Sequence, residues 1–296
     1  MSGVTSVSPD PFVTHRSLLF TVAYEMLGSA VDAEDVVQET WLAWRRVEQA
    51  EVRDPRAFLV RVVTRKALDQ MRTVARRREE YVGPWLPEPL LTSPDVAEDV
   101  ELADSLSTAM LLVLETLTPT QRAVFLLHDV FDVGYEELAE AVGKTEAAVR
   151  QIAHRARAHV AERRPRGATS RADTRAALEA FRTALETGDL QRLVDILAPD
   201  VVMLGDGGGI KQALPRPILG ADKVGRLLSA GLPTVVGVMT GELVQVNGWP
   251  ALLVRLDGEV DSVMTMLVEE GLVCGIYTVR NPEKLSRILD VAQLTR

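Results

Sequence analysis

The 296-residue chain contains one cysteine, Cys274, and four histidines, His15, His128, His154 and His159. A single cysteine cannot form an intramolecular disulfide, and its spacing from the histidines does not match that of structural zinc sites. We therefore expect neither disulfides nor bound zinc, and the sequence predicts no metal, cofactor or catalytic site.

Long apolar segments are also missing. No run reaches the roughly 18 apolar residues that a membrane-spanning helix requires. Residues 1–11 are polar and do not resemble a signal peptide. We therefore expect a cytoplasmic protein. With 47% hydrophobic residues, the chain is too long for one ordinary domain and can fill two or three cores.

A basic surplus, which is usual in DNA-binding proteins, is absent too, since the net charge is -9. The charge is nevertheless sorted along the chain. Residues 53–78 contain nine basic and two acidic residues, and residues 144–166 contain seven and two. Residues 87–104 contain six acidic residues and no basic one. This pattern indicates two nucleic-acid contacts on separate modules, although a basic run is as often a solvated helix face.

The first half of the chain has the apolar spacing of helices. Asp54 and Pro55 supply a cap and a first helical residue, so we expect a helix from there to about Arg78. The prolines that follow exclude a regular helix and predict a stiff linker. Thr118 and Pro119 predict another helix start. The sequence thus predicts two all-α domains, residues 1–80 and 95–166, joined by a linker at 81–94.

The remaining residues, 167–296, have a different pattern. Two helices are expected first, at about 173–187 and 189–197. Short runs rich in Val, Leu and Met then alternate with Gly and Asp, which is typical of strands. The expected strands are 201–204, 235–246, 251–256, 260–268 and 272–279. This third domain is therefore expected to be α+β.

The sharpest local pattern is a helix-turn-helix at residues 134–157, broken at Gly143 and with Thr145 as the second cap. In its second helix Val149, Ile152, Ala153 and Ala156 share one face. The other face points outward, where base edges and phosphates would lie. The candidate DNA contacts on that face are Arg150, Gln151, His154 and Arg157.

Residues 114–157 resemble region 4 of extracytoplasmic-function sigma factors, and residues 32–44 and 67–72 resemble parts of their region 2. The resemblance implies a factor that binds core RNA polymerase, through the β′ clamp helices and the β flap, and reads the minus-10 and minus-35 promoter elements. An acidic stripe faces away from the packing residues Val36, Val37, Trp41 and Trp44, and would suit a basic partner helix. The stripe, the candidate polymerase contact, consists of Asp35, Gln38, Glu39 and Leu42.

In the next helix, four arginines recur at helical spacing and form a candidate ridge for melted promoter DNA. The preceding loop, residues 47–54, lies where such factors capture a flipped base. Arg65 and Phe58 depart from the Asn and Trp that are common in the family, so the base preference stays open. The four arginines are Arg61, Arg65, Arg72 and Arg76.

Three further motifs resemble the branch of these sigma factors that carries a fused SnoaL-like domain of the NTF2-like fold. In that branch the fused domain is thought to regulate the sigma factor in place of a separate anti-sigma protein, so none is expected here. Proline pre-sets an extended linker, and burying Trp85 is favourable, so we expect the linker to dock on the third domain. The three motifs comprise Trp85, Leu86, Pro87, Glu88 and Pro89; Asp206, Gly207, Gly208 and Gly209; and Asn281, Pro282, Lys284 and Leu285.

Two alternatives remain open at this point. An enzyme in the third domain would need an acid-base site, but that domain has no histidine, and Asp257, Glu259 and Asp261 surround an expected turn at Gly258. A ligand-sensing regulator would use the helix-turn-helix but would have no need of the acidic stripe. The glycines at 207–209 also fit an ordinary tight turn at a strand end.

Overall fold

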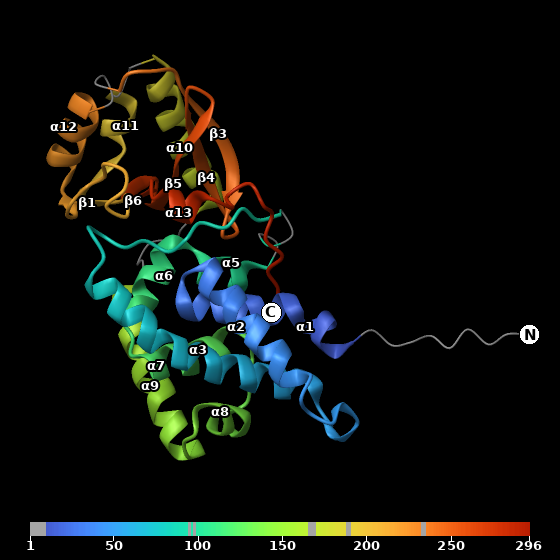
Figure 1. Cartoon of the computed structure of the whole chain (residues 1–296). Coiled ribbons are helices and arrows are strands. Elements are labelled where there is room, and N and C mark those ends of the chain that lie inside the picture. The colour runs from blue at the N-terminus through green and yellow to red at the C-terminus, as the bar shows by residue number, and fades with distance from the viewer. Residues whose placement is uncertain (1–9, 94–95, 97–98, 165–169, 188–190, 232–234) are drawn as a thin grey trace, which may run out of the picture. The chain divides into compact units, whose positions relative to one another are not determined.

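A computed structural model of the chain describes residues 10–93, 96, 99–164, 170–187, 191–231 and 235–296 (Figure 1). The chain divides into two compact units. The first comprises Met1–Val74, Leu117–Ala158 and Leu294–Arg296, and the second Ala75–Thr116 and His159–Gln293. Among the described residues, no helix combines the length and apolar character needed to span a bilayer.

The first unit is helical. Its elements are α1 (Pro11–Leu27), α2 (Ala30–Trp44), the short 3-10 turn η1 (Gln49–Glu51), the first part of α3 (Pro55–Glu79), α7 (Pro119–Phe125), the π-turn η2 (Leu126–Val130), α8 (Tyr135–Val142) and most of α9 (Glu146–Arg163). The predicted starts at Pro55 and Pro119 are confirmed. Thr118 and Gln121 form a reciprocal capping box at the start of α7.

The helix-turn-helix break at Gly143 is also confirmed. Gly143 adopts φ 66°, in the left-handed region, and its N–H bonds to the carbonyl of Ala139 at the end of α8. The Oγ1 atom of Thr145 accepts from the N–H of Ala148, 3.3 Å away, at the start of α9. A glycine that ends one helix and a threonine that caps the next fix the angle between them.

The second unit contains the predicted α+β domain together with the linker segment and helices α5 and α6, which the sequence analysis assigned to the helical domain at 95–166. Its helices are α5 (Val100–Leu106), α6 (Thr108–Glu115), α10 (Arg171–Thr187), α11 (Gln191–Asp195), α12 (Ala221–Gly231) and α13 (Pro282–Leu285). Its strands are β1 (Leu197–Asp206), β2 (Ile218–Leu219), β3 (Met239–Val246), β4 (Trp249–Leu256), β5 (Glu259–Glu269) and β6 (Leu272–Val279). They form one sheet in the order β2-β1-β6-β5-β4-β3, in which only the β1–β6 pair is parallel among the described strands.

The sheet carries a hydrophobic core on each face. On one face Phe181 of α10 and Val224 of α12 pack against strand residues such as Met264 of β5. On the other face lie Leu86 from the segment between α3 and α5, Leu285 from α13, and strand residues such as Val263. Figure 1 shows the strongly curved strands β3–β6 with α10 beside them and α13 near their other side. The segment that was expected to be a linker is thus part of a core.

Several predicted boundaries in this unit are wrong. The helix expected at 189–197 includes only α11, and β1 begins at Leu197, four residues before the predicted strand. The strand expected from Val235 begins at Met239. Residues 218–219, 221–231 and 282–285 form β2, α12 and α13, which were not predicted. The two-residue β2 and the one-turn α13 contain too few residues for a periodic pattern, whereas the 11-residue α12 is long enough for one and was overlooked.

Candidate functional site

The acidic stripe lies on the exposed face of α2. Asp35, Gln38 and Glu39 are exposed, and Leu42 exposes 47% of its surface. Val36, Val37 and Trp44 are buried on the opposite face, but Trp41 is 43% exposed, so its assignment to the packing face was wrong. Trp41 therefore adds an aromatic side chain to the solvent-facing surface of α2.

Neighbouring groups hold the stripe in place. The Nζ atom of Lys66, on α3, lies 2.8 Å from Oε2 of Glu39. Asp32, buried one turn earlier on α2, accepts a hydrogen bond from Nε2 of Gln70 at 2.9 Å. These contacts join α2 to α3, so the candidate polymerase contact lies beside the candidate minus-10 helix.

The arginine ridge on α3 is already engaged within the first unit. Arg61 forms an ion pair with Glu140 of α8. Arg65 donates from Nη2 to the carbonyl of Glu140 at 2.5 Å and from Nε to that of Ala141 at 3.3 Å. Carbonyls at the end of a helix attract cations. Two of the predicted DNA contacts are therefore occupied by the first helix of the helix-turn-helix.

The other members of the ridge are placed differently. Arg72 is exposed and pairs with Asp69, 3.1 Å away on its own helix. Arg76 belongs to α3, but its side chain lies outside the described part of the chain. Phe58 packs against Trp44 with ring centroids 5.8 Å apart, and Arg61 lies over its ring. The expected base-capturing loop contains η1.

A buried contact joins α1 and α7 in the same unit. Arg122 is almost fully buried and donates from Nε to the carbonyl of Glu25 at 2.8 Å. Burial lowers the pKa of Arg122 to about 10, although the charge of Glu25 opposes the shift. A buried guanidinium is stable only when its partners stay in place. The sequence offered no pattern that singled out this pair.

The predicted outward face of α9 is exposed. Arg150, Gln151, His154 and Arg157 all face solvent, whereas Val149, Ala153 and Ala156 are buried. Two of the arginines also have neighbours that orient them. Arg150 pairs with Glu146 and lies over the ring of Tyr135, and Arg157 donates to Asp129 at 2.7 Å. Gln151 and His154 extend from the same face between these two anchored cations.

In the second unit, the three motifs predicted to be regulatory converge on the carboxylate of Asp206, at the end of β1. Asp206 has no exposed surface. Its Oδ1 accepts from the hydroxyl of Tyr81 at 2.5 Å and from the N–H of Gly208 at 3.1 Å. Its Oδ2 accepts from the N–H of Leu86 at 2.9 Å and from Nζ of Lys284 at 2.7 Å. One carboxylate therefore holds the linker, the glycine turn and α13 together.

Lys284 fills the space between the linker and α13. Its Nζ also donates to the carbonyl of Leu86 at 2.5 Å and lies 4.0 Å from the centre of the Trp85 ring. Arg78, at the end of α3, contacts the same ring at 3.6 Å. Burial lowers the pKa of Lys284 to about 8, although the charge of Asp206 opposes the shift. Trp85 thus stacks between two cations.

The glycines at 207–209 allow close packing in this cluster. A Cβ on Gly207 would lie 2.0 Å from the carbonyl oxygen of Lys211. Gly208 has φ 62°, and a Cβ there would meet the side chain of Asn281 at 2.3 Å. Asn281 caps α13 and donates from Nδ2 to the hydroxyl of Tyr81 at 2.8 Å. The turn is tight because another motif packs directly on it.

The rest of the linker is buried along the sheet. Residues 86–90 are buried, including Pro87, Glu88 and Pro89, whereas Pro282 is exposed at the start of α13. The N–H of Leu90 donates to Oδ1 of Asn247 at 3.1 Å, and the N–H of Thr92 donates to the carbonyl of Gln245 at 3.0 Å. Tyr81 and Asn247 were missed from sequence because each lies outside the recognisable motifs.

Two of the candidate acid-base residues of the third domain, Asp261 and Asp257, are engaged in other contacts. Asp261 binds Arg280 through both carboxylate oxygens, at 2.8 and 3.1 Å, and Lys211 at 3.2 Å. Burial would raise the pKa of Asp261, but the hydrogen bonds and charges of Arg280 and Lys211 outweigh it and lower that pKa. Asp257 accepts from the N–H of Val238 at the strand turn. A general base near neutral pH needs the opposite shift.

Comparison with known proteins agrees with this geometry. A family model described as sigma-70 region 2 matches residues 12–78, and one described as sigma-70 region 4 matches residues 107–160. The ECF RNA polymerase sigma factor SigJ of Mycobacterium tuberculosis (strain H37Rv) is 38% identical over 292 residues, which cover 93% of this chain and 92% of that protein. The chain belongs to the extracytoplasmic-function sigma factors.

Other relatives of this sigma factor cover it to a similar extent. The probable ECF RNA polymerase sigma factor SigI of M. tuberculosis (strain CDC 1551) is 31% identical over 274 residues, covering 92% of each chain. The crystal structure of M. tuberculosis SigJ aligns with a TM-score of 0.72 and 34% identity, covering 93% of this sigma factor and 97% of that chain. The similarity therefore includes the α+β domain as well as regions 2 and 4.

Proposed function

We propose that the α+β domain regulates this sigma factor in cis by holding the linker between regions 2 and 4. The family directs RNA polymerase to promoters, and the proposal concerns what controls that activity. The observation that carries it is the buried carboxylate of Asp206, which accepts from Tyr81 and Leu86 of the linker and from Lys284 of α13. A linker held at several points cannot adjust the distance between the two DNA-reading regions.

The contacts within the first unit support a closed state of regions 2 and 4. Arg61 and Arg65 must leave α8 before they can contact promoter DNA. The buried contact between Arg122 and Glu25 opposes that separation. Binding of polymerase would have to supply the free energy that opens these contacts and releases the linker.

We assign the exposed face of α2 to the β′ clamp helices and region 4 to the β flap. The face carries Asp35 and Glu39 beside exposed Trp41 and Leu42, so it combines charge with apolar area. On α9, Gln151 and the anchored Arg150 would read the minus-35 element. The domain boundaries at 80, 94 and 166 remain part of this proposal.

The α+β domain takes, in this proposal, the role that a separate anti-sigma protein has elsewhere, and it performs no chemistry. Asp261, which binds Arg280 and Lys211, stays ionised beside these two cations. A domain that holds a linker through hydrogen bonds and packing needs no reaction to do so.

The test combines run-off transcription with limited proteolysis of the linker. Transcription with core polymerase and cleavage of the linker are each measured for four purified proteins. These are the full-length protein, Trp85→Ala, a chain ending at Arg280 and a chain ending at Thr169. The first two changes should speed cleavage near residues 81–92 and raise transcription, because each removes contacts that hold the linker. The chain ending at Thr169 lacks the whole α+β domain. If that domain also stabilises the open arrangement of regions 2 and 4, this chain should show lower transcription even though its linker is released.

Unchanged cleavage and transcription in all three variants would contradict regulation in cis. A matched substitution at an exposed aromatic residue outside the linker, Trp41→Ala, controls for general destabilisation. It should leave linker cleavage unchanged and lower only the affinity for polymerase. Strong repression by an added second protein, with no effect of the linker variants, would assign regulation to a separate anti-sigma factor.

A further inference from the structure

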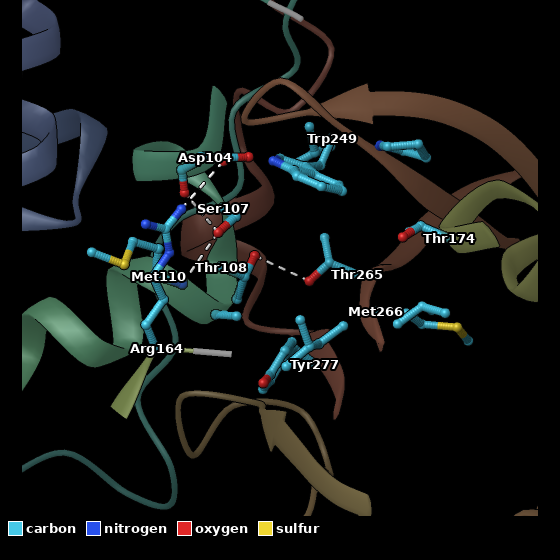
Figure 2. A pocket seen from close by; sticks show the side chains of 15 residues that line it. Asp104, Ser107, Thr108, Met110, Arg164, Thr174, Trp249, Thr265, Met266 and Tyr277 are labelled. Atoms are coloured by element: carbon cyan, nitrogen blue, oxygen red, sulfur yellow. Dashed lines mark hydrogen bonds and ion pairs between the residues drawn. The ribbon is translucent and has the colours of Figure 1, made fainter. Parts of the chain in front are cut away.

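A cavity of about 440 Å³ lies within the second unit, where α6 meets the sheet. Figure 2 shows that its walls come from several elements: Ser107 and Thr108 at the start of α6, Thr174 on α10, Trp249 on β4, and Thr265 on β5. It is separate from a second cavity of about 360 Å³ on the α10 and α12 face of the sheet, which is lined by Met203, Met264 and Thr278. The volume is within the range of small-molecule sites.

One buried polar group faces this cavity without a partner. Thr174 is 1% exposed, and its Oγ1 has no hydrogen-bond partner within the described part of the chain. In Figure 2 the hydroxyl of Thr174 points into the space toward Thr265. Buried hydroxyls are usually satisfied, and an unsatisfied one that faces a cavity marks a place for a ligand atom.

Much of the remaining wall is apolar, and several of its polar groups are bonded to other residues of the second unit. The indole N–H of Trp249 donates to the carbonyl of Ala103 at 2.9 Å, so its polar edge is already bonded, and the guanidinium of Arg171 lies over the ring, 5.2 Å from its centre. The hydroxyl of Thr265 donates to Oγ1 of Thr108 at 3.1 Å. Met110 and Met266 supply adaptable apolar surface. These groups favour a flat apolar body and offer one directional polar contact.

The two charged residues that line this cavity pair with each other. Arg164, at the start of the segment after α9, lies 3.4 Å from Asp104 of α5. Burial raises the pKa of Asp104, although the charges of Arg164 and Arg171 oppose the shift. A charged ligand would have to be desolvated in a site whose own cation and anion are already paired.

We propose that this cavity binds a small uncharged molecule with a flat apolar body and a carbonyl-type acceptor that receives a hydrogen bond from Thr174. The body lies against the Trp249 ring and the two methionines. Because Thr108 belongs to the first helix of region 4 and Trp249 to the sheet, such a ligand touches both elements and stabilises their packing. The binding site does not depend on regulation in cis, since it is defined without reference to transcription.

Binding can be measured with prodan, an uncharged naphthalene dye that carries one ketone. Prodan is titrated into the full chain, and the change in its fluorescence reports binding. We expect one saturable site. Thr174→Val keeps the shape of the side chain and removes its donor, and should weaken binding by about 3- to 10-fold.

The control is Thr278→Val in the second cavity, where Oγ1 is likewise buried without a partner in the described residues. It should leave prodan affinity unchanged. A loss in Thr278→Val with none in Thr174→Val would move the site to the second cavity and overturn the proposal. So would the absence of saturable binding, or tighter binding of the anionic dye anilinonaphthalene sulfonate. Matching thermal unfolding midpoints for the two variants exclude a folding defect.

Discussion

The Nζ atom of Lys284 lies 2.7 Å from Oδ2 of Asp206, and the exposed fractions of the two side chains are 11% and 0%. The aspartate ends β1 and the lysine belongs to α13, yet both also bind Leu86 of the linker. This ion pair is therefore the point at which three distant segments of the chain depend on one another. The linker is a structural part of the α+β domain rather than a free connection.

Removing the charge of Asp206 should lower the free energy of unfolding. Asp206→Asn keeps the shape but leaves the ammonium of Lys284 buried without its anion. Breaking a buried pair from one side costs about 3 to 5 kcal/mol, which urea unfolding of the full chain can measure. Asp290→Asn is the matched control because that aspartate forms an exposed pair with Arg287, and its effect should stay within about 0.5 kcal/mol. Equal effects would show that Asp206 does not hold the cluster.

The stability should depend on the titration of Lys284. Its pKa is about 8 in the folded chain and 10.5 without burial. Between these values the unfolded chain binds more protons, so the free energy of unfolding rises with pH; below about pH 8 both states are protonated and the effect ends. Lys284→Met should lack this rise when urea unfolding is compared at about pH 7.5 and 9.5.

Tyr81 sets the highest pH at which this unfolding comparison is useful. Burial, and then the hydrogen bond to Asp206, raise the pKa of Tyr81. Tyr81 therefore keeps its proton in the folded chain while the unfolded chain loses it above about pH 10, which lowers stability there. Measurements below that range leave out the titration of Tyr81, and the comparison with Lys284→Met removes the contribution of groups common to both proteins, such as Cys274, whose pKa burial raises. The same pH dependence in the wild type and in Lys284→Met would contradict this assignment.

Polymerase binding should depend on the charge of α2. Reversing Asp35 and Glu39 to Lys places like charges opposite a basic partner and should weaken the affinity for core polymerase by several-fold or more. Glu186 and Glu242, which are exposed in the second unit, give a double reversal with the same change in net charge and no expected effect. Equal affinities for both double variants at moderate salt would remove this face of α2 from the account.

Promoter reading should distinguish the residues of α9. Replacing Gln151 or Arg150 with Ala should cost about 1 to 3 kcal/mol at particular base pairs, whereas Arg157→Ala should weaken binding to all sequences alike if it holds a phosphate. Anisotropy titrations with single-base variants of a minus-35 duplex give these values. Uniform losses for all three variants would mean that α9 contacts the backbone only.

The sequence predicted the helical domains well because their ends carry local chemistry. Pro55, Thr118 and Gly143 each specify a helix boundary without help from distant residues. The helical period alone was enough to predict which face of α9 is exposed. The same reasoning placed Trp41 on the wrong face, since a residue at the border of an amphipathic face can be exposed or buried depending on what packs beside it.

The candidate regulatory cluster was predictable only in part. The resemblance named Trp85, Asp206 and Lys284, but their mutual geometry depends on a sheet that forms between residues far apart in sequence. Tyr81 and Asn281 contact each other although they are 200 positions apart in the sequence. A local sequence pattern cannot relate two residues that far apart. The engagement of Arg65 by α8 was unpredictable for the same reason, because it requires regions 2 and 4 to pack together.

Hydrogen exchange at the amide of Leu86 tests the central claim most directly, because that N–H donates to buried Asp206. Exchange of the linker peptide is measured for the free chain and for the chain bound to core polymerase. If polymerase competes with the α+β domain for the linker, the amide is protected in the free chain and exchanges at least about ten times faster in the complex. Equal protection in both states would contradict regulation through linker release.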